Sequence, residues 1–246
     1  MRKLLLTLSF VSLSILATSQ EVDTIHVGEK FKSYHNLKPG EYKYLVYMEK
    51  RELLRPTVLM MSTVSEISNN NEKLLSISHI WRSFDQKMNG NFFSVLRPET
   101  LEPVIHIRES NKGKEAYEFH KDSLVGLDSA SNNLEAEYSR KLEEPIFNFE
   151  IDIETFSCLP LTDNYKAALY FYHPGSTYGG PAWYSIEVER SEELELPGGS
   201  KLDTWVLFID YNGTQPTRFW YTKETQDFVK MEGDYNGTKI VKSRLF

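Results

Sequence analysis

The sequence has a single cysteine, Cys158, and no cluster of histidines. One cysteine among 246 residues cannot form a disulfide within the chain, so the fold must be stabilised by its apolar core. The thiol lies in an apolar stretch without a neighbouring histidine, which is typical of a buried structural cysteine and not of a catalytic nucleophile.

Recognisable metal and catalytic motifs are also missing. The six histidines form no His-x-x-x-His pair, and a hydrogen-bonded structural role is usual for strand histidines such as His79, His106 and His120. The loop from Gly175 to Gly180 has threonine where a nucleophile elbow has serine, and it lacks the lysine of a phosphate-binding loop. The sequence therefore predicts no metal, no cofactor and no catalytic residue.

Positive charge is scarce. Lys and Arg total 28 against 35 Asp and Glu, which gives a net charge of −7. This balance argues against binding to nucleic acid and to anionic membrane surfaces. The acidic residues between Glu187 and Glu195 alternate partly with apolar ones, so we interpret them as the solvent-facing side of strands. Two of them could instead lie close enough for glycosidase chemistry.

A long apolar run occurs only near the N-terminus. Basic residues at positions 2 and 3 precede the run from Leu4 to Leu16, and small residues follow it. This order predicts a signal peptide, residues 1–19, that is cleaved before Gln20. The run is shorter than the roughly 20 residues of a membrane span, and no cysteine stands at the junction for lipid attachment. We therefore expect a soluble periplasmic or secreted protein, not lipid-anchored, with no stable membrane insertion after signal removal.

Turn signals and β-favouring residues dominate the rest of the chain. Residues 20–39 form a mostly polar N-terminal arm, and residues 40–246 contain short aromatic and β-branched segments separated by turns. No internal repeat or linker divides them. The pattern predicts a single, mainly all-β domain, built as a large curled antiparallel sheet or open barrel. We expect two-residue hairpin loops at Asn212-Gly213 and Asn236-Gly237, and one strand over Glu115–Leu127.

The stretch from Pro145 to Pro160 fits either a helix or a strand. Apolar residues recur at spacings of three and four, as a buried helix face requires, and this face consists of Ile146, Phe149, Ile153, Phe156 and Pro160. A helix would point Glu150 and Glu154 outward and leave Ile151 off the buried face. The alternation of apolar and polar residues from Phe147 to Glu154 fits a half-buried strand equally well. A central helix here would cover the inner face of the curled sheet.

Aromatic residues are abundant, with 14 Tyr, 14 Phe and 4 Trp. Most aromatic residues in a β-rich protein fill its core, and some could line a cavity on the concave face. We predict ligand-binding roles for five of them: Trp81, Tyr178, Trp183, Trp205 and Trp220.

The C-terminal third contains a set of turn and packing residues: Phe156, Leu159-Pro160-Leu161, Tyr165-Lys166-Ala167, Glu187-Val188-Glu189, Leu196-Pro197-Gly198-Gly199, Trp205, Trp220-Tyr221-Thr222-Lys223 and Asn236-Gly237. Together with the stretch Arg97–Pro103, they resemble a family of exported bacterial domains of unknown function that is common in Bacteroidota. Such domains are similar to the lipoprotein carriers LolA and LolB, in which a strongly curved antiparallel sheet wraps over helical segments around an apolar interior. The resemblance implies a helix at Pro145–Pro160 and implies no catalytic residues. The chain departs from LolB in lacking a lipidated cysteine.

Three functional hypotheses remain. The first is a non-catalytic exported envelope protein that binds an apolar or amphipathic, lipid-like ligand in a concave sheet. The second is a structural or assembly factor of the cell envelope that recognises protein or glycan, and the third is a hydrolase. A solvent-open cavity lined by Trp and Tyr would favour the first, and a filled interior with an exposed aromatic patch the second. Clustered carboxyl groups with raised pKa inside a cleft would favour the third.

Overall fold

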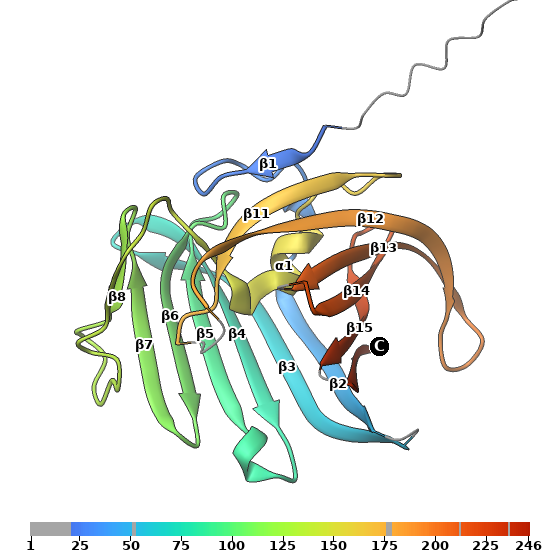
Figure 1. Ribbon diagram of the computed structural model, residues 1–246, viewed down its shortest axis with the longest axis horizontal. Coiled ribbons are helices and arrows are strands. Elements are labelled where there is room, and N and C mark those ends of the chain that lie inside the picture. Colours follow the sequence, from blue (N-terminus) through green and yellow to red (C-terminus); the bar gives the residue numbers. More distant parts are fainter. Residues whose placement is uncertain (1–20, 51–52, 176–178, 212, 236) are drawn as a thin grey trace, which may run out of the picture.

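A large curled sheet wraps over one short helical segment (Figure 1). The computed structural model describes residues 21–50, 53–175, 179–211, 213–235 and 237–246. Its strands are β1 (Asp23–Ile25), β2 (Gly40–Lys50), β3 (Leu53–Asn69), β4 (Glu72–Arg82), β5 (Gly90–Leu96), β6 (Pro103–Ser110), β7 (Gly113–Phe119), β8 (Ser123–Gly126), β9 (Ser139–Lys141), β10 (Phe147–Asn148), β11 (Lys166–Tyr172), β12 (Ala182–Glu195), β13 (Lys201–Tyr211), β14 (Gln215–Thr222), β15 (Phe228–Tyr235) and β16 (Thr238–Leu245). Its helical segments are η1 (Tyr34–Asn36), η2 (Gln86–Met88), η3 (Phe149–Ile151) and α1 (Asp152–Ser157).

The strands of the described residues pair in one sheet, in the order β1-β11-β12-β13-β14-β15-β16-β2-β3-β4-β5-β6-β7-β8-β9. Strands β1 and β10 pair in parallel with β11, and the other pairs are antiparallel. All of the antiparallel pairs join strands that are consecutive in the sheet and in the sequence, except the pair of β16 with β2. The order runs from β1 to β9, which do not pair, so the curl stays open (Figure 1). The predicted fold class, a mainly all-β curled antiparallel sheet with one central helical segment, is confirmed.

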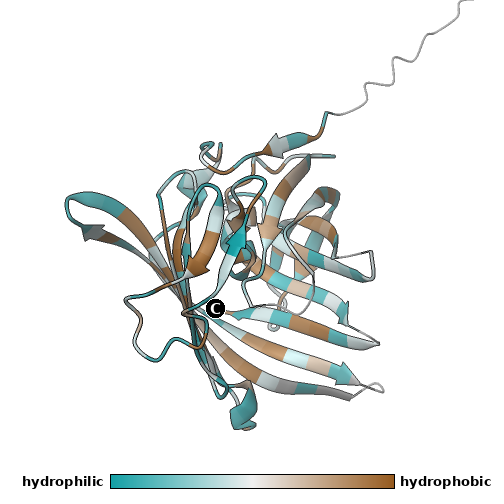
Figure 2. Ribbon diagram, turned by 60° about the vertical axis from the view of Figure 1, so that its left-hand side comes forward, coloured by the Kyte–Doolittle hydropathy of each residue, from teal (hydrophilic) through white to brown (hydrophobic). Residues whose placement is uncertain are grey.

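Alternation along the strands determines which face each side chain occupies. Phe219 and Tyr221 of β14 are fully buried in the main core, whereas Trp220 between them belongs to a separate cluster with Val206 and Val229. Figure 2 shows apolar and polar residues alternating along the strands. Successive side chains of a strand point to opposite faces, so this part of the sheet buries apolar residues on both of its faces.

The N-terminal arm packs into the main core. Ile25 of β1 and Phe31 are buried there, and β1 adds to the edge of β11. The backbone N–H of Ser33 donates to the carbonyl of Cys158 at 3.1 Å, which ties the arm to the end of the helical segment. Cys158 is itself fully buried, and burial raises the pKa of its thiol to about 12.

The stretch from Pro145 to Pro160 combines both predicted structures. Its first residues pair as β10 with β11, and the chain then turns through η3 into α1. Asn148 makes the transition: its side-chain oxygen accepts a hydrogen bond from the N–H of Glu150 at 3.1 Å, as a capping residue does. The helix is therefore confirmed but shorter than expected, because only Asp152–Ser157 has α-helical hydrogen bonding.

The predicted faces of this helix are partly wrong. Ile151 was expected off the buried face but is 1% exposed, and Glu154 was expected to point outward but is 5% exposed. Glu150 also points inward, whereas Phe149 is only half-buried. The physical reason is that the segment lies inside the curl, where sheet surrounds it on several sides (Figure 1). A helix so enclosed has no continuous solvent face.

The backbone of the segment is held by strands from the C-terminal half. The hydroxyl of Tyr221 donates to the carbonyl of Ile153 at 2.8 Å, and the Gln226 side chain donates to the carbonyl of Leu159 at 2.7 Å. The ring of Phe156 is fully buried against Phe219 at a centroid distance of 5.3 Å. The two hydrogen bonds tie the backbone near the start of α1 and just after its end to the C-terminal half of the chain.

Two other expectations need correction. Residues 115–127 form two strands, β7 and β8, because the chain turns where the N–H of His120 donates to the carbonyl of Ser123 at 2.8 Å. The loop at Asn212-Gly213 has three residues, since Tyr211 pairs with Gln215 and the Asp210 carboxylate accepts from the Gln215 N–H at 2.9 Å.

The loop at Asn236-Gly237 has the two residues expected, because Tyr235 pairs with Thr238. Both glycines adopt the positive φ that the turns require, +70° at Gly213 and +74° at Gly237. Asn212 and Asn236, the other halves of these pairs, lie outside the described residues.

Candidate functional site

A cavity of about 350 Å³ lies on the concave side of the sheet, beside the helical segment. It is partly open to solvent, and its wall is mostly apolar. Phe149 and Asp152 contribute from the helical segment, His173 and Gly180 from the connection between β11 and β12, and strands β2, β4 and β11 to β16 contribute the remaining wall. A volume of this size is typical of a site for a small molecule.

Aromatic rings form much of the wall. Phe149 lies at their centre, with its ring 5.1 Å from that of Tyr211 and 6.2 Å from that of Tyr184, measured between centroids. The ring of His173 stacks on its other side at 5.7 Å. These ring contacts, edge-to-face for Tyr211, tilted for Tyr184 and stacked for His173, hold the rings against one another, so the cavity has preformed walls.

Trp81 joins the wall from β4 and packs against Phe92 at 5.2 Å. Its indole N–H is buried and has no hydrogen-bond partner among the described residues. Leaving a buried donor unpaired costs about 1–3 kcal/mol.

Three charged side chains interrupt the apolar wall: Asp152, Lys242 and, at an exposed position of β15, Asp234. Asp152 accepts hydrogen bonds from the hydroxyl of Tyr211 at 3.1 Å and from the N–H of Ile153 at 2.7 Å. Burial nonetheless raises the pKa of its carboxyl group to about 6. Lys242 lies opposite on β16, where burial lowers the pKa of its ammonium group.

The ammonium group of Lys242 has neither an ion pair within 4 Å nor a hydrogen bond in the described part of the chain. The carboxylates of Asp152, Glu154 and Glu150, in decreasing order of influence, raise the pKa of this ammonium group against the effect of burial. Two of these three carboxylates are committed to other partners.

Glu150 belongs to an ion-pair network at the rim of the cavity. Its carboxylate contacts the imidazole of His173 and lies 3.7 Å from the guanidinium of Arg108, which also pairs with Glu115. Burial alone would raise the pKa of Glu150, but the hydrogen bond from His173 and the nearby positive charges hold it at about 2. This carboxylate is therefore ionised at neutral pH.

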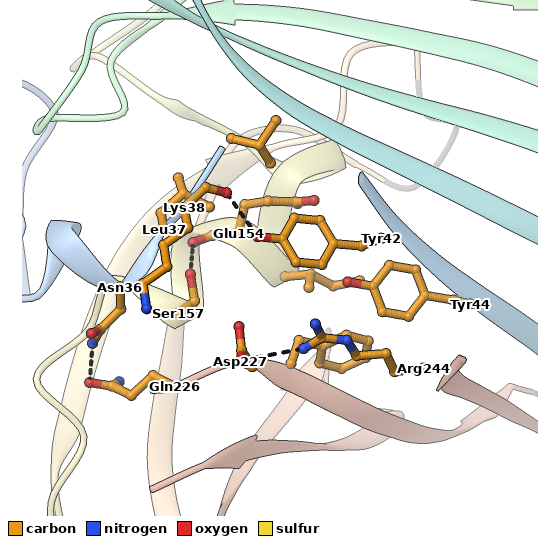
Figure 3. Close-up of a pocket in the computed structure, with 13 residues that line it drawn as sticks. Asn36, Leu37, Lys38, Tyr42, Tyr44, Glu154, Ser157, Gln226, Asp227 and Arg244 are labelled. Carbon is orange, nitrogen blue, oxygen red and sulfur yellow. Dashed lines mark hydrogen bonds and ion pairs between the residues drawn. The ribbon is translucent and has the colours of Figure 1, made fainter. Parts of the chain in front are cut away.

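Glu154 points to the other side of the helix, toward β3 and β4. Its carboxylate lies 2.8 Å from the imidazole of His79 and accepts from the hydroxyl of Ser62 at 3.0 Å. Burial would raise its pKa, but these two partners lower it. Figure 3 shows Glu154 and Ser157 beside Tyr42 and Tyr44, around a second cavity of about 30 Å³, which has room for about one water molecule.

The buried histidines have structural partners. His106 is fully buried, its imidazole lies 2.9 Å from the hydroxyl of Ser94, and burial lowers its pKa to about 4. Asn148 donates to the same serine at 3.1 Å, so this network anchors the start of the helical segment. No three His, Cys, Asp or Glu side chains within the described ranges are placed to hold a metal ion. No helix in those ranges is long and apolar enough to cross a membrane.

The structure places the five predicted ligand-binding residues in different environments. Trp81 lines the cavity. Trp183 is 40% exposed and lines a groove on the other face of β12, where its indole donates to Glu144 at 3.1 Å. Trp205 packs against the main core under Lys223, and Trp220 is buried in the separate cluster of β13 to β15. Tyr178 lies outside the described residues.

The sequence reasoning missed the residues that give this cavity its chemistry: Phe149 as a wall residue, Asp152, Tyr211 and Lys242. A weak signal for Lys242 existed, because it follows Ile240 by two positions and so shares its face of β16. Residues 152, 211 and 242 lie far apart in the sequence, so no local pattern could predict that they are close in space.

A family model matches residues 43–242, and its description is protein of unknown function, DUF3108. The chain belongs to this family. The match covers most of the curled sheet, from β2 to β16, together with the helical segment. The resemblance to a domain family of unknown function is thereby confirmed. No curated protein matches the chain.

Solved structures provide a second comparison. The chain is similar to a beta-barrel-like protein of domain of unknown function DUF1849 from Brucella abortus, with a TM-score of 0.51 and 9% identity, over 84% of this chain and 95% of that one. At this level of identity the similarity concerns the fold alone. It agrees with the curled, barrel-like sheet observed here.

Proposed function

We propose that this protein is a non-catalytic, exported envelope protein that binds a small apolar or amphipathic molecule in its concave cavity. The observation that carries the proposal is the cavity of about 350 Å³, with preformed aromatic walls and few polar groups. Pockets of this size and composition are the usual sites of small-molecule binding. The interior of the curl is thus not filled, which favours a binder over a purely structural factor.

The carboxylates near the cavity argue for binding and against hydrolysis. Asp152 has the raised pKa of a candidate general acid. A glycosidase pair needs a second carboxylate free to act as base or nucleophile. Glu150 is instead paired with His173 and Arg108, and Glu154 is paired with His79. Both oxygens of Asp152 already accept hydrogen bonds from Tyr211 and Ile153.

The order of residues 1–19 supports export: basic residues, an apolar run and small residues before Gln20. N-terminal sequencing of the protein from its native cell should find Gln20 first, in soluble periplasm or medium. Recovery of a cytoplasmic protein that begins at Met1 would refute this part of the proposal.

Binding can be tested with a neutral apolar fluorophore, N-phenyl-1-naphthylamine. The wild-type protein should enhance its fluorescence in a saturable manner. Ile240→Trp places a large ring inside the cavity and should abolish the enhancement. Lys239→Trp adds the same ring one residue earlier, on the other face of β16, and should leave binding unchanged.

Circular dichroism should show that both variants are folded. Equal binding by Ile240→Trp and wild type would refute the cavity as the site. If binding in the cavity is confirmed, native mass spectrometry of protein purified from its own envelope should identify the bound molecule. If only Lys239→Trp loses the fluorescence enhancement, the binding site lies on the outer face of the sheet, which favours the assembly-factor hypothesis.

A further inference from the structure

The charges of the cavity wall restrict what it can bind. Half-buried Lys242 brings an ammonium group to the wall of a mostly apolar space, and no side chain in the described ranges lies within 4 Å to neutralise it as an ion pair. A buried charge without a partner is unfavourable, and a binding partner of opposite sign relieves that cost. Lys242 is therefore the group on this wall with most to gain from a ligand.

The neighbouring carboxylates do not form an ion pair with the ammonium group of Lys242. Glu150 contacts Arg108 and His173, and Glu154 accepts a hydrogen bond from Ser62 and lies beside His79. Asp152 remains; it accepts hydrogen bonds from the hydroxyl of Tyr211 and the N–H of Ile153, and among the described residues it forms no ion pair with Lys242. A second cation in the cavity would meet the ammonium group of Lys242, which repels it.

We infer that the ligand of this cavity is an amphipathic molecule with an anionic head group of the carboxylate type, which pairs with Lys242. This inference rests on the proposed function. The apolar body lies against the rings of Phe149, Tyr184 and Tyr211. Charge-assisted hydrogen bonds from an ammonium to a carboxylate are about twice as strong as neutral ones, so the head group selects acids over alcohols of equal chain length. Trp81, whose buried indole N–H has no partner among the described residues, is likewise a hydrogen-bond donor on this wall.

Asp152 opposes this anion but does so weakly. Because the pKa of its carboxyl group is about 6, protonation of Asp152 at pH 7 lowers the affinity of the protein for the anion by only about tenfold. The titratable groups that face it are Lys242, Tyr211, Tyr221 and Glu154, with His173 and Asp234 elsewhere on the cavity wall. Binding of an anion should therefore be accompanied by proton uptake, and Asp152→Asn should bind the anion more tightly than wild type at pH 7.5.

Isothermal titration with decanoate, decanol and decyltrimethylammonium tests the inference. Decanoate should bind about ten- to a hundredfold more tightly than decanol, and the cation should bind most weakly. Lys242→Met keeps the length of the side chain and should reduce decanoate binding to the level of decanol. Lys242→Arg should keep the preference. Lys239→Met, which removes a positive charge from the other face of the same strand, should change nothing.

The results separate the two proposals. If decanol and N-phenyl-1-naphthylamine bind in the cavity but decanoate has no advantage, the head-group inference is wrong and the proposed function stands. If no apolar probe binds wild type at all, the proposed function itself fails. Preference for decanoate that survives in Lys242→Met overturns the role of Lys242. A free single-chain acid and a phospholipid are distinguished by repeating the titration with short-chain phosphatidic acid.

Discussion

Two acidic stretches of this protein, residues 150–154 and residues 187–195, have similar alternation but opposite environments. The inner one lies inside the curl, and each of its carboxylates meets a dedicated partner from another element. The outer one runs along β12 and forms ion pairs near solvent, such as Glu189 with Arg218 and Glu193 with Lys201. Alternation of acidic and apolar residues therefore does not reveal which face is wet. Partner residues that are distant in the sequence determine which face is exposed to solvent.

The largest expected effect contrasts the apolar residues of the two stretches. Ile151→Asn places an amide in the main core, where Ile151 is fully buried, and should destabilise the protein by about 3–5 kcal/mol. Leu194→Asn, at a half-buried position of the outer stretch, should cost about 1 kcal/mol or less. Urea unfolding of both variants measures the difference. Similar losses would mean that the inner segment is not enclosed as described.

Removal of one carboxylate from each stretch gives the next effect. Glu154→Ala leaves His79 and Ser62 buried without their partner and should cost about 3 kcal/mol. Glu193→Ala breaks an exposed pair with Lys201 and should leave the stability unchanged within the error of the measurement. If Glu154→Ala is as stable as wild type in thermal or chemical unfolding, the proposed burial of this pair is contradicted.

The pH dependence of stability should show the strain at Asp152. Its folded-state pKa of about 6 lies above the ordinary value of 3.8, so the stability that it contributes is present at low pH and is lost as the pH rises through 6. Between pH 5 and pH 7.5, wild type should lose about 1 kcal/mol relative to Asp152→Asn. The comparison cancels the titration of the histidines. Parallel pH profiles for the two proteins would show that Asp152 titrates normally.

The smallest effect belongs to the outer ion pairs. Glu189→Gln weakens the paired contact with Arg218, whose two nitrogens each lie 2.7 Å from a carboxylate oxygen, and should cost about 0.5–1 kcal/mol. The loss should shrink in high salt, because exposed charges are screened. A loss that is independent of salt would indicate that this pair is shielded from solvent.

The fold was largely predictable from local patterns, for reasons that particular residues illustrate. The alternation that places Trp220 opposite Phe219 and Tyr221 is written directly in the sequence, as are the turns with glycine at positive φ. Asn148, in contrast, starts as a strand residue and then caps η3, and no pattern within Pro145–Pro160 announces that switch. The prediction therefore found the segment but misassigned the directions of Ile151 and Glu154.

The cavity was mostly unpredictable. Of the five aromatic residues predicted from the sequence, Trp81 lines it, whereas its chemistry depends on Asp152, Tyr211 and Lys242 from three distant elements. The faces of these residues follow from alternation, but their proximity follows from the pairing of β16 with β2 and from the entry of the helical segment into the curl. Sheet order on this scale is a global property, and a local pattern carries little information about it.

The pairing of β16 with β2 has a consequence for how the protein folds. Hairpins such as β3–β4 join neighbours in sequence and can form early, but the β16–β2 seam joins strands from opposite ends of the matched region. The entropy of closing so large a loop must be offset before that seam contributes, so its formation should limit the folding rate. Until then the long edges of β2 and β16 present unpaired backbone groups, which makes this seam the place where an incompletely folded chain would pair with another copy of itself.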